Sequence, residues 1–292
     1  MTRAMLLAAL LVAGAAQAEL RVTDDYGKPV VLAAPARRVV SLAPHLTELM
    51  YAAGAGERLV GAFAYSDYPP EAKSLPRVGS EAQIDLEALV ALKPDLVIAW
   101  PQSGSTRAVE RIAALGIAVF RSEPRELEDI ARTLETLGRL AGTEAAARAA
   151  AGAFRERAAR LYRTYASRPV VRVFYQVWDR PLITVNGDHV ISKVLRLCGG
   201  ENVMAKLPAL APEIDRERVL RSDPEVIVAS GTDGARPPWL DDWNAFPAMA
   251  AVRGGNLYAL RPELLQRHTP RLLDGAEQLC RIFEAVRAKR RR

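Results

Sequence analysis

The chain has 292 residues, of which 50% are hydrophobic and 25% are charged, a balance typical of a globular protein and not of a disordered one. Lysine and arginine together number 40 against 34 acidic residues, which gives a formal net charge of +6. The basic residues are scattered, and only Lys289 to Arg292 form a dense cluster, so we expect a solvated tail and no nucleic-acid partner.

Met1 to Ala18 is typical of a cleaved secretory signal. One early positive charge, Arg3, precedes an apolar segment and a small-residue end at Ala16 to Ala18. The apolar segment is too short to span a bilayer, and no later run approaches the roughly 20 residues that a membrane helix requires. No cysteine lies at the cleavage site to carry a lipid. We therefore expect cleavage near Ala18 and a soluble periplasmic protein.

The first predicted lobe, residues 19–142, alternates strands and helices. Arg38 to Ala43 has a buried-strand pattern, and a helix follows from Pro44. His45 comes directly after this strand, at the end where open α/β sheets bind ligands. His45 therefore either contacts a ligand or is simply exposed to solvent at a helix N terminus. Further strands are predicted at Leu59 to Phe63 and Ile117 to Phe120.

Two aromatic residues of this lobe also lie just beyond predicted strands. Tyr65 begins the turn-rich loop that ends at Pro70, and Trp100 follows a strand that ends at Ala99. An aromatic ring in such a position can stack on a flat ligand or simply cover the edge of the lobe.

One segment of the first lobe occurs again in the second half of the chain. Ile84 to Trp100 and Ile214 to Ser230 align without gaps and share Ile, Asp, Glu, Pro and Ala at matching places. In each copy an aspartate can cap a short helix, a proline ends it, and a β-branched apolar run predicts a buried strand. Such units also arise by chance in α/β proteins. The repeat nevertheless favours two similar lobes with a binding cleft between them.

Residues 143–168 are predicted to form the connection between the lobes. Thr143 to about Ala166 consists mainly of the strong helix formers Ala, Arg, Glu and Leu, and such a helix extends roughly 35 Å. Pro169 ends it. A single stiff helix resists wide hinge closure, so we expect only a small opening motion.

The second lobe, residues 169–292, repeats the alternation of strands and helices. Strands are predicted at Val170 to Val177 and Leu257 to Leu260, and helices at Ile191 to Leu197 and from Pro270 onward. Arg267 belongs to a strand-to-helix loop, where it either faces the cleft or is an ordinary surface arginine. Cys198 and Cys280 are the only cysteines, and in an exported chain we expect them to form a disulfide; metal binding by the pair is the weaker alternative.

Motifs of catalysis are missing from the sequence. There is no G-x-S-x-G, no H-E-x-x-H and no G-x-x-x-x-G-K, so we expect no enzymatic activity, with an exported α/β enzyme as a remote alternative. The three histidines, His45, His189 and His268, are far apart in the sequence. A shared metal site would require three loops to converge, and we therefore expect none.

Several segments give the chain its resemblance to a known family. They are Tyr65 to Pro70 (YSDYPP), Leu89 to Trp100 (LVALKPDLVIAW), Val194 to Asn202 (VLRLCGGEN), and Pro270-Arg271 leading to Gln278-Leu279-Cys280. The chain resembles the periplasmic ligand-binding proteins of ABC importers with a rigid connecting helix, and among them the cobalamin-binding proteins. The resemblance implies an α/β fold of two Rossmann-like lobes joined by a single long rigid helix, with the ligand cleft between the lobes.

The resemblance also implies roles for individual residues. Tyr65, Trp100 and Arg267 match pocket positions of the family, and Glu263 stands where an aspartate is usual. Two further acidic residues, Glu87 and Glu217, match the two glutamates, one per lobe, that dock onto arginines of the permease dimer; plain solvated glutamates are the alternative. The two cysteines match the family's disulfide.

The chain departs from the family where aromatic residues usually line the pocket. Tryptophans are common at the positions of Glu81 and Ala211, and an aromatic residue at that of Ile183. Losing this stacking surface weakens affinity or signals another ligand: a different corrinoid, haem or a ferric siderophore. Haem would want an axial Tyr or His, for which Tyr65, Tyr68 and His45 are candidates.

Taken together, the sequence predicts a monomeric periplasmic receptor with no cofactor or metal of its own. It is expected to capture a corrinoid, most simply cobalamin, at a site that includes His45, Tyr65, Glu81 and Trp100 of the first lobe. An inner-membrane ABC permease is its expected partner, and haem or ferric-siderophore capture is the alternative function.

Overall fold

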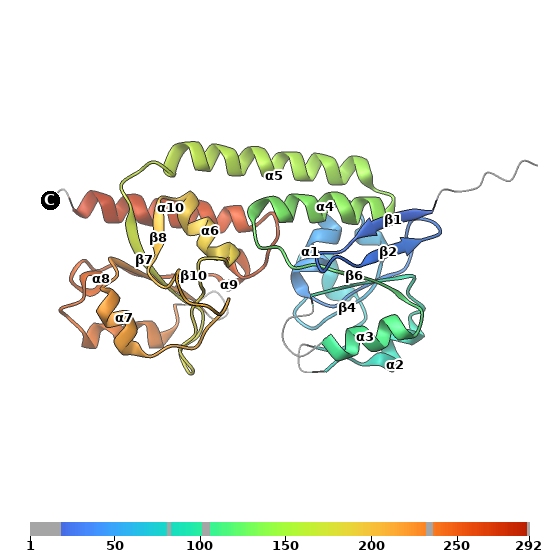
Figure 1. Ribbon diagram of the computed structural model, residues 1–292, viewed down its shortest axis with the longest axis horizontal. Helices are drawn as coiled ribbons and strands as arrows, with labels where there is room; N and C mark the ends of the chain where they lie inside the picture. The colour runs from blue at the N-terminus through green and yellow to red at the C-terminus, as the bar shows by residue number, and fades with distance from the viewer. Residues whose placement is uncertain (1–18, 81–82, 101–105, 232–235, 291–292) are drawn as a thin grey trace, which may run out of the picture.

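The computed structural model describes residues 19–80, 83–100, 106–231 and 236–290, and Figure 1 shows their arrangement. The predicted signal, residues 1–18, and Glu81 lie outside the described residues. Within these residues the strands form two four-stranded parallel sheets and one two-stranded antiparallel hairpin. The predicted α/β architecture of two lobes is confirmed, because each sheet lies in a different half of the chain.

The first sheet has the strand order β4-β3-β5-β6. Its strands are β3 (Val39–Ser41), β4 (Leu59–Ala62), β5 (Leu96–Ala99) and β6 (Ala118–Arg121). All four residues of β5 are buried, as its continuous apolar run predicts. The surrounding helices are α1 (Pro44–Ala52), α2 (Leu86–Ala91), α3 (Thr106–Ala114) and α4 (Leu127–Ala141), with 3-10 turns η1 (Gly56–Arg58) and η2 (Pro70–Ser74).

The second sheet has the order β10-β9-β7-β8. Its strands are β7 (Val171–Gln176), β8 (Gly200–Asn202), β9 (Val226–Ser230) and β10 (Leu257–Leu260). The helices of this lobe are α6 (Val190–Leu197), α7 (Arg216–Ser222), α8 (Ala250–Arg253), α9 (Pro262–Leu265) and α10 (Leu272–Lys289), with the 3-10 turn η3 (Pro238–Ala245).

The internal repeat has the same local structure in both lobes. The Asp85 carboxylate accepts the backbone N–H of Ala88 at 2.9 Å, and that of Asp215 accepts the N–H of Arg218 at 2.6 Å. These aspartates cap α2 and α7, and each short helix leads into the buried strand β5 or β9. The predicted unit of capped helix and buried strand is therefore confirmed in both copies.

The chain passes from one sheet to the other once, between β6 and β7, by way of α4 and α5 (Glu144–Tyr165). Figure 1 shows α5 lying along the top of the molecule over both lobes, beside α4 and α10. Arg157 of α5 pairs with Asp274 and Glu277 of α10 at 2.7 and 2.8 Å. The predicted residue boundaries of the lobes, 19–142, 143–168 and 169–292, stay predictions.

Some elements were not expected from the sequence. The hairpin of β1 (Leu20–Thr23) and β2 (Pro29–Leu32) is one, and β8 is another. The sequence of β8, Gly-Glu-Asn, contains no β-branched residue, and the strand forms because its backbone pairs with buried β7. Gly199, just before β8, has φ +71, and an added Cβ would lie 2.8 Å from the Tyr165 carbonyl, so this turn requires glycine.

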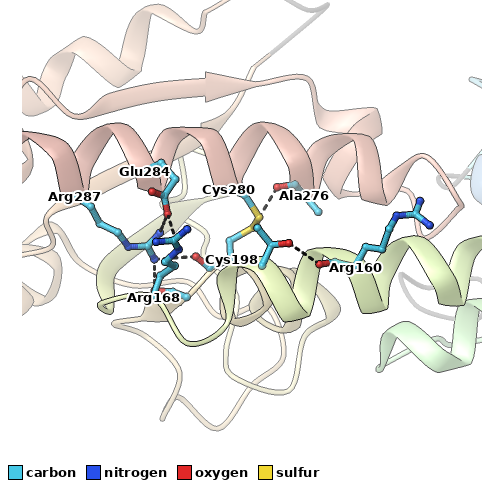
Figure 2. Close-up of a disulfide and its surroundings, with 9 residues drawn as sticks. Arg160, Arg168, Cys198, Ala276, Cys280, Glu284 and Arg287 are labelled. Atoms are coloured by element: carbon cyan, nitrogen blue, oxygen red, sulfur yellow. Dashed lines mark hydrogen bonds and ion pairs between the residues drawn. A yellow bond between two sulfur atoms is a disulfide. The ribbon is translucent and has the colours of Figure 1, made fainter.

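The predicted disulfide is confirmed. Cys198 at the end of α6 is bonded to Cys280 of α10, across a sequence separation of 82 residues (Figure 2). Nearby, Arg287 donates to the carbonyls of Cys198 and Gly199 at 2.9 and 3.0 Å. The covalent bond and these hydrogen bonds fix the C-terminal helix to the end of α6.

No helix in the described part of the chain combines the length and the apolar character that crossing a membrane requires.

Candidate functional site: the cleft between the lobes

A cavity of about 390 Å³ lies between the two lobes, and we call it the cleft cavity. It is lined by Pro44, His45, Trp100, Val177, Val185, His189, Ile191, Leu210, Ala211, Gln266, Arg267 and His268. Trp100 and Val177 are the residues directly after β5 and β7, and His45 is the second residue of α1, shortly after β3. The cavity therefore lies at the carboxyl ends of parallel strands from both sheets, the usual position of a ligand site in an open α/β fold.

Three histidines meet in this cavity, and we call His45, His189 and His268 the histidine cluster. The ring centroid of His268 lies 5.9 Å from that of His45 and 5.6 Å from that of His189. Trp100 contacts the cluster from the N-terminal lobe, with its ring edge-on to His45 at 5.2 Å. The three histidine loops, which are far apart in the sequence, thus converge at the cavity. Their sequence spacing gives no sign of this convergence, which arises because two similar lobes face one another.

The histidine cluster is uncharged at neutral pH. Burial, together with the positive charge of Arg267, lowers the pKa of His45 to about 3. Burial lowers the pKa of His189 to about 4, and burial and the two neighbouring histidines lower that of His268 well below 6.5. Each ring is therefore a neutral imidazole with one N–H group and one lone pair.

The hydrogen bonds of the three rings differ. The Nδ1 atom of His189 accepts the backbone N–H of Ile191 at 3.1 Å and so caps α6, which places the proton of the neutral ring on Nε2. In contrast, His45 Nε2 and His268 Nδ1 are buried without a hydrogen-bond partner among the described residues. In the described ranges, no group of three or more His, Cys, Asp or Glu side chains is arranged to hold a metal ion.

Arg267 lines the cleft cavity and also joins the two lobes. Its Nη1 atom lies 2.8 Å from Glu48 Oε1 and 2.6 Å from Asp67 Oδ1, and its Nη2 donates to the Tyr65 carbonyl at 3.0 Å. Arg271 donates to both oxygens of the same Glu48 carboxylate, at 3.0 and 2.8 Å.

We call Glu48, Asp67, Arg267 and Arg271 the inter-lobe ion-pair network. The Glu48 side chain is only 2% exposed, so its charge is compensated by the two arginines and not by water. Partial burial alone would raise the pKa of Asp67, but the hydrogen bond and charge of Arg267 hold it below its ordinary value. Neither Glu48 nor Asp67 was singled out from the sequence, because pairing across 200 residues leaves no local pattern.

The remaining pocket residues predicted from the sequence are placed at the edge of the cavity or outside it. The Tyr65 side chain is 80% exposed, and its backbone has φ 61. Glu263 lies in the first turn of α9, where it pairs with Arg261 and does not line the cavity. Ala211 lines the cavity, whereas Ile183 is half-buried in a bridge to Trp178. The structure thus brings His45, Trp100 and Arg267 together and adds His189 and His268, which the sequence analysis missed as site residues.

The two predicted docking glutamates occupy equivalent places in the two lobes. Glu87 and Glu217 are both exposed and lie in the first turns of α2 and α7. Figure 1 shows these helices at the bottom of their lobes, on the side opposite to α5. Both carboxylates thus lie on the side of the molecule opposite to α5.

Comparison with known proteins agrees with this architecture. A family model described as "Periplasmic binding protein" matches residues 39–264. The chain belongs to this family. Vitamin B12-binding proteins of Vibrio cholerae and Yersinia pseudotuberculosis are 39% and 40% identical to it over 246 and 253 residues, which cover 84% and 86% of the chain and 88% of each relative.

Solved structures similar to this chain share its fold. The crystal structure of the periplasmic vitamin B12 binding protein BtuF of Vibrio cholerae has a TM-score of 0.79 and 38% identity, covering 87% of this chain and 98% of that one. A periplasmic heme binding protein from Pseudomonas aeruginosa has a TM-score of 0.74 and 28% identity, covering 84% and 91% of the two chains. Membership of the family places the protein in the periplasm.

Proposed function

We propose that this periplasmic binding protein captures a corrinoid, cobalamin, between its lobes and delivers it to an inner-membrane ABC transporter without catalysing a reaction. The observation that carries the proposal is the similarity to vitamin B12-binding proteins, at 38–40% identity over nearly the whole of the described chain. Cleavage of the signal near Ala18, a monomeric state, and the absence of a cofactor or metal of its own belong to the same proposal.

The chemistry of the cleft cavity suits a flat macrocycle with polar substituents. Its walls include apolar side chains, among them Val185, Ile191 and Leu210, against which a ring can pack. Trp100 supplies an aromatic ring, and Gln266 and Arg267 supply hydrogen-bond donors for the amide groups at the rim of a corrin. Tyr65 and Glu263, which do not line the cavity, are proposed to contact these substituents once the lobes have opened. Glu81 belongs to the proposed site by its family position.

A cavity of about 390 Å³ is smaller than a whole cobalamin, so binding requires the lobes to separate. The contacts that must loosen are those of the inter-lobe ion-pair network and of the histidine cluster. Because one stiff helix, α5, spans the lobes, we propose that the opening is small and that part of the ligand stays outside the cleft.

Titration of the purified mature protein tests this function directly. Cobalamin, haemin and a ferric siderophore are titrated in parallel, followed by tryptophan fluorescence and calorimetry. We expect submicromolar one-to-one binding of cobalamin and no comparable binding of the other two. Binding of haemin or the siderophore in place of cobalamin would show that the family is right and the ligand is wrong, and turnover of a bound compound would point to an enzyme.

Haem is the second candidate, because neutral histidines in the cleft are potential axial ligands and a heme binding protein has a similar structure. Of the tyrosines considered from the sequence, Tyr68 stacks under the Arg271 guanidinium at 3.8 Å, and Tyr65 points to solvent. A histidine is therefore the better candidate for an axial ligand in this cleft.

We also propose that Glu87 and Glu217 dock the protein onto a two-fold symmetric permease. Their support is the equivalence of α2 and α7 in the repeat and the exposure of both carboxylates. An exposed ion pair contributes only about 0–1 kcal/mol, so these residues orient the complex more than they strengthen it.

A further inference from the structure

The histidine cluster is more than a hydrogen-bonding wall of the cleft. A buried polar atom without a partner destabilises a folded protein and calls for an explanation, and the cluster contains two such atoms, His45 Nε2 and His268 Nδ1. His45 and Trp100 belong to the N-terminal lobe, whereas His189 and His268 belong to the C-terminal lobe. Separating the lobes to admit a ligand therefore moves His268 and His189 away from His45, whose Nε2 atom is buried while the lobes are together.

His45 is the best placed of the three rings to bind a metal. Its Nε2 atom has no hydrogen-bond partner among the described residues, and a ring nitrogen with a free lone pair is the form that coordinates metals. Edge-on packing against Trp100, at 5.2 Å, holds the ring in place within its own lobe. His189 is excluded, because its Nδ1 lone pair already accepts the Ile191 N–H and its Nε2 carries the proton.

We propose that His45 Nε2 coordinates the central metal of the bound macrocycle, so that the cleft selects corrinoids with an exchangeable axial position. This inference rests on the proposed function and names the form of the ligand. With aquocobalamin, the Co–OH₂ bond breaks, water leaves, and the Nε2 lone pair forms a Co–N bond. The reacting tautomer of His45 carries its proton on Nδ1, and cobalt stays Co(III). Cyanocobalamin, whose cyanide holds that position firmly, is bound without this bond.

The test compares aquocobalamin with cyanocobalamin on the wild-type protein and on His45→Gln, with His189→Gln as a matched control for removing a cleft histidine. The readouts are the visible absorption bands of the corrinoid and the calorimetric Kd. For the wild type we expect the aquocobalamin bands to shift and its affinity to exceed that for cyanocobalamin by about tenfold or more. The shift and the preference should both disappear in His45→Gln, whereas His189→Gln should still show the shift.

A second measurement needs no variant. Cobinamide lacks the nucleotide base of cobalamin, so after reduction to Co(II) any axial nitrogen seen by electron paramagnetic resonance comes from the protein. We expect the three-line splitting of a single nitrogen in the complex with the wild-type protein.

The outcomes separate the inference from the proposed function. Equal binding of both corrinoids with no band shift and no nitrogen splitting would overturn axial coordination but leave corrinoid capture intact. A shift that survives in His45→Gln and disappears in His268→Gln would overturn the assignment to His45. Failure of every corrinoid to bind would remove the proposed function and this inference together.

Discussion

At the scale of single residues, the cleft is defined by side chains that burial keeps uncharged. His45, His189 and His268 share one small cavity without charge repulsion because each has its pKa lowered by desolvation. Arg267, at the edge of the same cavity, stays paired with the carboxylates of Glu48 and Asp67. The histidine rings are neutral and the charge of Arg267 is compensated by two carboxylates, so neither group places an unpaired charge in the cleft.

This arrangement predicts that acid destabilises the protein. In the unfolded chain a histidine binds a proton near pH 6.5, whereas in the folded protein the pKa is about 3 for His45 and about 4 for His189. Between these values the unfolded state binds more protons, so stability is retained above pH 6.5 and declines as the pH falls toward about 4. Each such histidine contributes a slope of up to about 1.4 kcal/mol per pH unit.

Urea unfolding at pH 7, 6 and 5 measures this slope. Unfolding of His45→Gln should take up about one proton fewer over this range than unfolding of the wild type. The stability of the variant, relative to its own value at pH 7, should therefore fall less steeply with decreasing pH. Arg267 is the charged group that acts on the pKa of His45, and its guanidinium is paired with Glu48 and Asp67, whereas Glu123, Arg125 and Asp188 lie around His189 and His268. Identical slopes in variant and wild type would show that His45 is not buried as a neutral ring.

At the scale of secondary-structure elements, the two lobes are stabilised in different ways. The second lobe has a covalent bond between α6 and α10, with the Arg287 hydrogen bonds beside it (Figure 2). The first lobe has no cysteine. Its α4 packs along α5, and Arg155 of α5 pairs with Glu128 and Glu135 of α4, each at 2.5 Å.

Removing the disulfide should lower stability while leaving the fold intact. Closing a loop of 82 residues stabilises the folded state by about 4–5 kcal/mol in the chain-entropy model, and both cysteines are fully buried. We expect the Cys198→Ala/Cys280→Ala variant to lose up to this amount in urea unfolding. As a control, a thiol reductant present during unfolding should lower the stability of the wild type toward that of the variant. The stability of the variant itself should not change. A reductant-sensitive variant would contradict the prediction.

Local pattern sufficed to predict some elements and failed for others. The capped helices after Asp85 and Asp215, the long helix α5 and the strands β5 and β9 depend on neighbouring residues, and all were predicted. Strand β8 depends on its partner strand, so its own three residues gave no sign of it. Convergence of the histidines and the pairing of Glu48 with Arg267 depend on how the lobes face one another, which sequence periodicity does not encode.

At the scale of the whole molecule, the inter-lobe ion-pair network opposes separation of the two lobes. Glu48 on α1 of one lobe accepts hydrogen bonds from Arg267 and Arg271 of the other. Because the Glu48 carboxylate is almost fully buried, neutralising it leaves the guanidinium groups of Arg267 and Arg271 without this partner, and breaking a buried pair in this way is destabilising.

Weakening this contact should shift the protein toward an open form. In Glu48→Gln we expect a loss of about 1.5–3 kcal/mol in stability and a larger radius of gyration by solution scattering in the absence of ligand. Glu57, an exposed glutamate of the same lobe, provides the matched control, and Glu57→Gln should change stability by less than about 0.5 kcal/mol. An unchanged radius of gyration in Glu48→Gln would show that the network does not hold the cleft closed.

The face opposite α5 is where the whole molecule is proposed to meet its permease. Charge reversal at Glu87 and Glu217 together should abolish uptake of the ligand by whole cells, because like charges would then oppose the permease arginines at both docking points. The ligand affinity of the purified variant should stay unchanged, since both residues are on helices that do not line the cleft cavity.

The matched control reverses two exposed glutamates of α5, Glu144 and Glu156, on the opposite side of the molecule in Figure 1. Uptake with Glu144→Lys/Glu156→Lys should equal that of the wild type, because the change in net charge is the same and only its position differs. Single reversals at Glu87 or Glu217 should each retain part of the uptake, since one lobe can still dock. Full uptake by the Glu87→Lys/Glu217→Lys variant would show that the two glutamates are solvated residues with no role in docking.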